Sequence, residues 1–194
     1  GENFRFGHRA SGDTETLGEL GVERGFTVDA EPLISGQGGV WSSTYVRALV
    51  QTGDVRSAAY SLGRPHRVEG TVVHGDHRGR ELGYPTANLS ATPHSAFPAD
   101  GVYAARLVLA PYTEHAVTYP AAVSVGTNPT FDGRERRVEA YVLDRSDLDL
   151  YGAHVAVDFV ERIRGQVRFE GPDAMADLVA QMARDVDEAR RLVG

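Results

Sequence analysis

The sequence predicts a mainly β fold: a six-stranded antiparallel barrel of Greek-key topology, with a C-terminal amphipathic helix and a partial α/β segment in front of the barrel. Runs rich in Val, Tyr or Phe recur from residue 66 onward, each bounded by Gly, Pro, Asn or Asp, which is typical of β-strands. Their spacing favours a compact antiparallel barrel over βαβ units. Near the end of the chain the apolar residues change to helical spacing.

Six strands are expected in order along this part of the chain. RVEGTVVHG supplies the first strand and the short PTANL segment the second. The expected ranges are residues 67–75, 85–89, 101–110, 117–126, 136–144 and 154–163. In the final segment, residues 173–193, the apolar side chains of Leu178, Met182, Val186 and Ala189 recur at helical spacing. One amphipathic helix should therefore pack on the barrel.

The part of the chain before the barrel has a different character. Residues 1–40 are rich in glycine and hold few strand-like runs beyond GFTVDAEPLI at 25–34. The following segment, SSTYVRALVQTGDVRSAAYSLG, has a helical pattern that Gly53-Asp54 interrupts. Ser42 or Ser43 is the expected N-cap.

A GRP linker at residues 63–65 leads from this helical segment into the strands. The sequence therefore divides into an N-terminal segment, residues 1–62, and a domain, residues 63–194.

Composition excludes several classes of chemistry. The 194 residues carry a formal net charge of −7 and include neither cysteine nor lysine. Without cysteine these residues form no disulfide, zinc–thiolate site or thiol nucleophile. Without lysine they form no Walker A loop and no lysine Schiff base. A bound metal would be held by oxygen or imidazole, and oxygen ligands suit Mg²⁺ or Mn²⁺.

The acidic balance disfavours a general nucleic-acid binder, whose affinity rests on neutralising phosphates. A few local arginines nevertheless suffice for small phosphorylated ligands. The apolar runs are far shorter than the ~20 residues that span a membrane, and the first residues include no apolar signal region. We therefore expect a cytoplasmic protein with neither a nucleic acid nor a membrane as partner.

The dodecamer RGRELGYPTANL is too polar for a core strand. Pro85 restricts the backbone to an extended path, so Thr86 and Asn88 point to the same side. Their hydroxyl and amide oxygens suit a hard cation or phosphate oxygens. Gly75 allows a ligand to approach the backbone, and Arg80 adds positive charge. A polar hairpin with only local turn hydrogen bonds explains the same residues equally well.

Glu139 lies in the expected strand RRVEAYVLD, where it shares a face with Arg137 and Tyr141. A carboxylate between an arginine and a tyrosine is a candidate proton acceptor. On these residues alone, a solvated cross-strand ion pair is the better interpretation. The preceding segment SVGTNPTFDG, residues 124–133, contains strong turn formers. It either covers a ligand or simply connects two strands.

Six motifs occur in order between residues 64 and 194: HGDHRGRELGYPTANL, GVYAARL, SVGTNPTF, VEAYVLD, DLYG and ERIRGQVRFEG. Together they closely resemble the riboflavin kinase domain, which is a six-stranded antiparallel barrel with a C-terminal helix. The resemblance implies an enzyme that uses ATP and Mg²⁺ to phosphorylate the 5′-hydroxyl of riboflavin, giving FMN and ADP. Such phosphoryl transfer mostly requires alignment and charge neutralisation.

The resemblance also implies roles for individual residues. Glu139 matches the catalytic base, and Thr86 and Asn88 match ligands of Mg²⁺ and of the ATP phosphates. Further nucleotide-side positions are Gly75, Arg80 and Tyr151, and flavin-side positions are Arg164 and Phe169. A non-catalytic barrel that only binds a flavin or nucleotide is the alternative. The joint presence of Thr86, Asn88 and Glu139 favours the enzyme.

The segments GENFRFGHRASGD and SSTYVR resemble the later part of the FMN adenylyltransferase domain, which precedes the kinase in bacterial bifunctional FAD synthetases. The HxGH-type nucleotide motif of that domain is absent from these residues. We therefore expect the chain to begin inside that domain and not to make FAD by itself, whatever the complete parent does. An oligomer is compatible with all these features.

Overall fold

The structure is a computed structural model that describes residues 1–36, 39–75, 79, 82–92, 95–130 and 133–194, with the backbone alone at 128–130 and 133–135. The chain forms two compact units, Gly1–Tyr45 and Val46–Gly194. The second unit thus includes residues 46–62, which the sequence division assigns to the N-terminal segment. The sequence boundary follows the GRP linker and the change in residue pattern, whereas the boundary between the two units follows contacts between residues.

The first unit contains a 3₁₀ turn, a helix and a two-residue ladder among its described residues. Their bounds are η1 (His8–Ala10), α1 (Thr14–Arg24), β1 (Ser35–Gly36) and β2 (Gly39–Val40). Asp13 is the N-cap of α1, because its Oδ1 accepts a hydrogen bond from the Thr16 N–H at 2.9 Å. Gly25 ends the helix in the left-handed conformation, with φ of 77°.

Two features of this unit differ from the sequence pattern. Helix α1 was not anticipated, because its apolar residues do not gather on one face, and Val22 is 90% exposed. The strand-like run at residues 25–34 forms no strand. Within this run the Glu31 carbonyl accepts a hydrogen bond from the Glu2 N–H at 2.8 Å, and the Ile34 carbonyl accepts one from the Trp41 N–H at 2.9 Å. These contacts do not extend into a strand ladder along the run.

Two helices follow, α2 (Ser43–Thr52) and α3 (Val55–Leu62). Ser42 is the N-cap of α2, since its Oγ accepts a hydrogen bond from the Tyr45 N–H at 3.1 Å. Gly53, with φ of 85°, ends α2. Asp54 then caps α3 by accepting a hydrogen bond from the Ser57 N–H at 3.0 Å. The helical segment and its interruption are confirmed, and α3 packs on β3 and β8 of the barrel.

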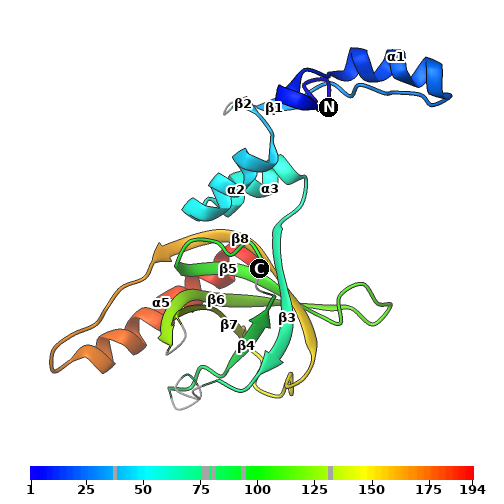
Figure 1. Cartoon of the computed structure of the whole chain (residues 1–194). Coiled ribbons are helices and arrows are strands. Elements are labelled where there is room, and N and C mark those ends of the chain that lie inside the picture. Colours follow the sequence, from blue (N-terminus) through cyan, green and yellow to red (C-terminus); the bar gives the residue numbers. More distant parts are fainter. Residues whose placement is uncertain (37–38, 76–78, 80–81, 93–94, 131–132) are drawn as a thin grey trace. The chain divides into compact units, whose positions relative to one another are not determined.

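The described strands of the second unit close into an antiparallel barrel of six (Figure 1). They are β3 (His66–Val73), β4 (Thr86–Ala91), β5 (Gly101–Leu109), β6 (Val117–Thr130), β7 (Gly133–Val142) and β8 (His154–Gly165). Around the barrel the order is β3-β4-β7-β6-β5-β8, and β8 pairs with β3. The predicted six-stranded antiparallel barrel is confirmed.

The segment at residues 124–133 is mostly strand rather than loop. The ladder between β6 and β7 continues to the pair Thr130 and Gly133. Both strands are therefore longer than the sequence pattern indicates, and residues 131–132 lie outside the described residues.

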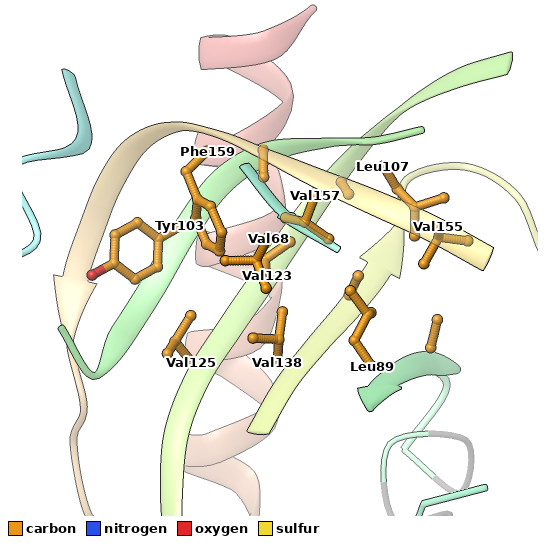
Figure 2. Packing of buried hydrophobic residues seen from close by; sticks show 14 of the residues in the cluster. Val68, Leu89, Tyr103, Leu107, Val123, Val125, Val138, Val155, Val157 and Phe159 are labelled. Atoms are coloured by element: carbon orange, nitrogen blue, oxygen red, sulfur yellow. The ribbon is translucent and has the colours of Figure 1, made fainter. Parts of the chain in front are cut away.

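The hydrophobic core lies inside the barrel, on one face of each strand (Figure 2). On β7, Val138 and Ala140 are fully buried, whereas Glu139 between them is only partly buried and faces outward. Tyr103 and Phe159 meet edge to face at one end of the core, with 5.2 Å between ring centroids. On β7 this alternation directs the Glu139 side chain to the outer face of the barrel.

The predicted C-terminal helix is α5 (Ala174–Val193), and it packs on the outer faces of β5, β6 and β8 (Figure 1). Its buried residues are Asp185, Ala189 and Val193, spaced four apart. None of residues 174–184 is buried. Apolar packing therefore anchors the C-terminal half of the helix to the barrel.

Candidate active site

Strand β4 presents two polar side chains on the outside of the barrel. Ala87 and Leu89 are buried in the core, so Thr86 and Asn88, which alternate with them, face outward. In the ladder between β4 and β7, Asn88 is the direct partner of Glu139 and Thr86 is the partner of Tyr141. The register thus brings a hydroxyl, an amide and a carboxylate to one outer surface.

Glu139 belongs to a row of residues that crosses the sheet. The successive partners in this row are Asn88, Glu139, Ser124, Val102 and Arg164, on β4, β7, β6, β5 and β8. Directly opposed residues of antiparallel strands share a face, so the row lies on one side of the sheet. Because neighbouring strands are about 4.8 Å apart, Glu139 and Arg164 are separated by about 14 Å along the sheet.

A cavity of about 260 Å³ opens over this row. Ser124, Glu139 and Arg164 contribute polar groups, and α5 forms one wall. Most of the remaining lining is apolar or aromatic: Leu82, Tyr84, Val102, Ala122, Val123, Tyr141, Val167, Phe169, Leu178, Met182 and Val186. We call this the outer cavity. An apolar cleft with a few polar groups is the usual form of a small-molecule site.

A second cavity, of about 330 Å³, lies beside the first and includes Pro85, Thr86 and Tyr151 in its lining. We call it the end cavity. Thr86 lines both cavities. The Tyr151 ring stacks on His74, with 4.1 Å between ring centroids. Thr86 therefore stands where two ligands that occupy the two cavities would meet.

The guanidinium of Arg145 also lines the end cavity. Its Nε and Nη2 donate hydrogen bonds to the two carboxylate oxygens of Asp147, at 2.7 and 2.9 Å. These hydrogen bonds lower the pKa of the Asp147 carboxyl. The same guanidinium lies 5.3 Å from the centroid of the Tyr119 ring.

Two glycines lie against the outward-facing side chains of β4. A Cβ atom placed on Gly75 would be 2.3 Å from the Asn88 amide nitrogen, and one on Gly79 would be 2.5 Å from the Tyr84 carbonyl oxygen and 3.4 Å from the Thr86 hydroxyl. Larger residues would displace these groups, so the backbone here approaches β4 closely because both positions are glycine.

The structure brings most of the predicted site residues together. Glu139, Arg164 and Phe169 line the outer cavity, Tyr151 lines the end cavity, and Thr86 lines both. Asn88 pairs with Glu139 in the ladder, and its amide lies against Gly75. Arg80 lies outside the described residues. Within the described residues, no three His, Asp or Glu side chains form a cluster for a metal ion.

Sequence reasoning missed Asp185, a charged residue that lines the outer cavity. The residue is 5% exposed, and its carboxylate accepts hydrogen bonds from the Arg164 guanidinium, from Nε at 2.9 and 3.1 Å and from Nη2 at 2.7 Å. A signal was present in the sequence, because Asp185 interrupts the apolar stripe between Met182 and Ala189. A charged residue on the apolar stripe of a helix usually has a buried partner.

Comparison with known families identifies the barrel and its helix. The family described as "Flavokinase: Riboflavin kinase" matches residues 62–193. The chain belongs to the riboflavin kinase family. The sequence resemblance is thereby confirmed, and the match covers the six barrel strands and the residues that line both cavities, together with α5.

Relatives of this family match along nearly the whole chain. The bifunctional riboflavin kinase/FMN adenylyltransferase of Escherichia coli K12 is 36% identical over 194 residues, which are 100% of this chain and 59% of the relative. The enzyme of that name from Bacillus subtilis is 32% identical over 98% of this chain and 58% of its own length. The chain thus spans less than two thirds of the length of these relatives.

A solved structure has the same fold. The crystal structure of a "Macrolide-efflux Protein from Streptococcus pneumoniae" superimposes with a TM-score of 0.83 at 35% identity, over 97% of this chain and 58% of that chain. Among the described residues of this riboflavin kinase family member, no helix combines the length and hydrophobicity needed to cross a membrane.

Proposed function

We propose that this chain transfers the γ-phosphoryl group of ATP to the 5′-hydroxyl of riboflavin, with FMN and ADP as products. The observation that carries the proposal is the register of β4 and β7, which pairs Asn88 with Glu139, a residue that lines the apolar outer cavity. Membership of the riboflavin kinase family supports the choice of substrates.

The nucleotide is assigned to the end cavity, with its γ-phosphate at Thr86. This residue lines both cavities, so a phosphate there lies within reach of a ligand in the outer cavity. Tyr151, stacked on His74, supplies an aromatic surface on the nucleotide side. Gly75 lets the backbone approach the Asn88 amide without displacing it, and the amide in this position is proposed to face the phosphates. Arg80, outside the described residues, is proposed to add charge to the same phosphates.

The Thr86 and Asn88 side chains fit a Mg²⁺ ion. Both provide neutral oxygens on one face of β4, next to glycines that leave no side chain in the way. Mg²⁺ prefers oxygen ligands and is usually shared between one or two protein groups, water and the phosphates of a nucleotide. When bound, the ion would neutralise charge that develops on the transferred phosphoryl group.

Glu139 is proposed as the general base. The 5′-oxygen of riboflavin forms a bond to the γ-phosphorus, the bond between that phosphorus and the β,γ-bridging oxygen breaks, and ADP leaves with its electron pair. The proton of the hydroxyl passes to the Glu139 carboxylate. Phosphoryl transfer depends chiefly on this alignment and on electrostatic stabilisation.

The flavin ring is assigned to the remainder of the outer cavity. With the 5′-hydroxyl at Glu139, the ring would extend across β6 and β5 toward β8, over Val102 and beside Phe169. Apolar and aromatic side chains suit a flat ring system. Arg164 would stand at the far end of the ring.

The test is the conversion of riboflavin to FMN by the purified chain with ATP and Mg²⁺, followed by chromatographic separation of the flavins. We expect FMN in proportion to enzyme and time, and none when ATP is omitted. Riboflavin binding without FMN would contradict the proposed reaction and would favour the alternative of a flavin-binding barrel without catalysis.

A further inference from the structure

The N-terminal half of α5 forms a wall of the outer cavity although the barrel does not bury it. Leu178 and Met182 line the cavity, yet no residue from 174 to 184 is buried. The apolar anchor of the helix lies further along, at Ala189 and Val193. The position of this wall therefore depends on the contacts that hold α5 to the sheet between its unburied N-terminal half and its apolar anchor.

That tie is an ion pair between the partly buried Arg164 and the buried Asp185. The Arg164 guanidinium donates to both carboxylate oxygens, through Nε at 2.9 Å and Nη2 at 2.7 Å. Gln181, one helical turn earlier, donates to Oδ1 from its Nε2 at 2.8 Å. The Arg164 and Asp185 side chains are 20% and 6% exposed. A buried carboxylate is tolerated when it is paired and hydrogen-bonded in this way.

The pair stands at the opposite end of the cavity from the reacting groups. Arg164 terminates the row that begins at Asn88 and Glu139, about 14 Å from Glu139 along the sheet. It also begins the segment that closes the cavity beside β6, where Gln166 donates a hydrogen bond to the Val125 carbonyl at 3.0 Å. The ion pair thus joins two walls of the cavity, residues 164–169 and α5.

We propose that Asp185 is a positioning residue for riboflavin, which acts with Gln181 to hold the Arg164 guanidinium and the N-terminal half of α5 against the flavin ring. The inference rests on the proposed riboflavin kinase activity. It predicts that loss of the pair weakens riboflavin binding while ATP binding and phosphoryl transfer, which use β4 and β7, are retained.

The test compares Asp185→Asn with the unaltered chain in initial-rate measurements that vary riboflavin and ATP separately. We expect the KM for riboflavin to rise about tenfold or more, from the loss of charge-assisted hydrogen bonds, and kcat and the KM for ATP to change less than about twofold. The proposal is overturned if the KM values for riboflavin and ATP rise by the same factor, or if the KM for riboflavin is unchanged.

Asp144→Asn is the matched control. Asp144 accepts a hydrogen bond from Arg190 of α5 at 2.9 Å, so it also ties the helix to the barrel. This pair is exposed and does not line the outer cavity. We expect unchanged kinetics for both substrates. A similar rise in the KM for riboflavin would show that any loosening of α5 suffices, and would overturn a specific role for Asp185.

A double variant separates positioning from simple support of the fold. Replacing a buried ion pair by apolar residues is often neutral for stability, so Arg164→Met/Asp185→Leu should melt near the temperature of the unaltered chain. If the pair positions riboflavin, the KM for riboflavin stays raised. If this variant has a normal KM for riboflavin, the pair only supports the fold and the proposal is wrong.

Failure of the inference is distinguishable from failure of the proposed function. If the unaltered chain produces no FMN, the kinase proposal fails. Quenching of riboflavin fluorescence on binding then still tests the role of Asp185 without turnover. If the unaltered chain produces FMN and binds riboflavin as tightly as Asp185→Asn does, only the inference fails.

Discussion

Replacement of Glu139 by glutamine tests the chemistry most directly. The substitution keeps the size and shape of the side chain, and the neighbours of residue 139 in the ladder, Asn88 and Ser124, keep their places. The negative charge and the capacity to accept a proton are lost. A general base contributes about 10²-fold to 10⁴-fold to the rate, so the barrier should rise by about 3 kcal/mol or more, at about 1.4 kcal/mol for each factor of ten.

We therefore expect kcat to fall at least about 100-fold while the KM values for ATP and riboflavin change little. FMN formation under saturating substrates, resolved by chromatography, measures the change. Riboflavin fluorescence quenching and thermal melting check that the variant binds its substrate and is folded.

Glu69→Gln is the control for this experiment. Glu69 lies on β3 and interacts with the hydroxyl of Tyr112 and, at 3.4 Å, with the ring of His154. It is a partly buried barrel carboxylate that lines neither the outer nor the end cavity. We expect its kcat to be unchanged. If Glu139→Gln lowers kcat no more than Glu69→Gln does, Glu139 serves structure and the proposed mechanism is wrong.

Three further outcomes are expected. Thr86→Ala should raise the KM for Mg·ATP about tenfold, and an unchanged Mg²⁺ dependence of the initial rate would contradict the cation site. Gly75→Ala should also raise the KM for ATP but not for riboflavin, because the new Cβ would meet the Asn88 amide nitrogen at 2.3 Å. Unchanged ATP kinetics would show that the close approach of residue 75 to Asn88 does not affect nucleotide binding. Burial lowers the pKa of His66 despite the hydrogen bond between its Nε2 and the Ala96 carbonyl at 2.6 Å. The unfolded chain therefore binds a proton more readily, and stability should fall as pH drops below about 6.5. Urea unfolding at about pH 7.5 and about pH 5.5 should show a smaller loss in His66→Gln than in the unaltered chain, and equal losses would contradict this assignment.

Local patterns were sufficient for the fold class and for much of the element order. Strand alternation, turn residues and the stripe of Leu178, Met182 and Val186 each depend on neighbours a few positions away. Helix α1 was missed because its apolar residues, among them the exposed Val22, do not form a stripe along one face of the helix. The continuation of the β6–β7 ladder to Thr130 and Gly133 was also missed, since turn formers near the tip suggested an earlier end to both strands.

The candidate site shows where local reasoning stops. From residues alone, Thr86 and Asn88 were as consistent with a polar hairpin as with a cation site, and Glu139 was better explained as a surface ion pair. The pairing of Asn88 with Glu139 depends on β4 lying beside β7 rather than beside β5. That neighbourhood is set by the closure of the whole barrel, which no short stretch of sequence encodes.

Periodicity and residue type are local properties, so they were enough to predict the barrel, the C-terminal helix and the polar candidates Thr86, Asn88 and Glu139. The tertiary structure alone decided that Glu139 and Arg164 lie on one row across the sheet, that Thr86 lines two cavities, and that Asp185 is buried against Arg164. Each of these depends on strand register and on the docking of α5, which join residues far apart in the chain. RGRELGYPTANL is the clearest case: its residues indicate which groups are available, and the neighbouring strand determines what those groups face.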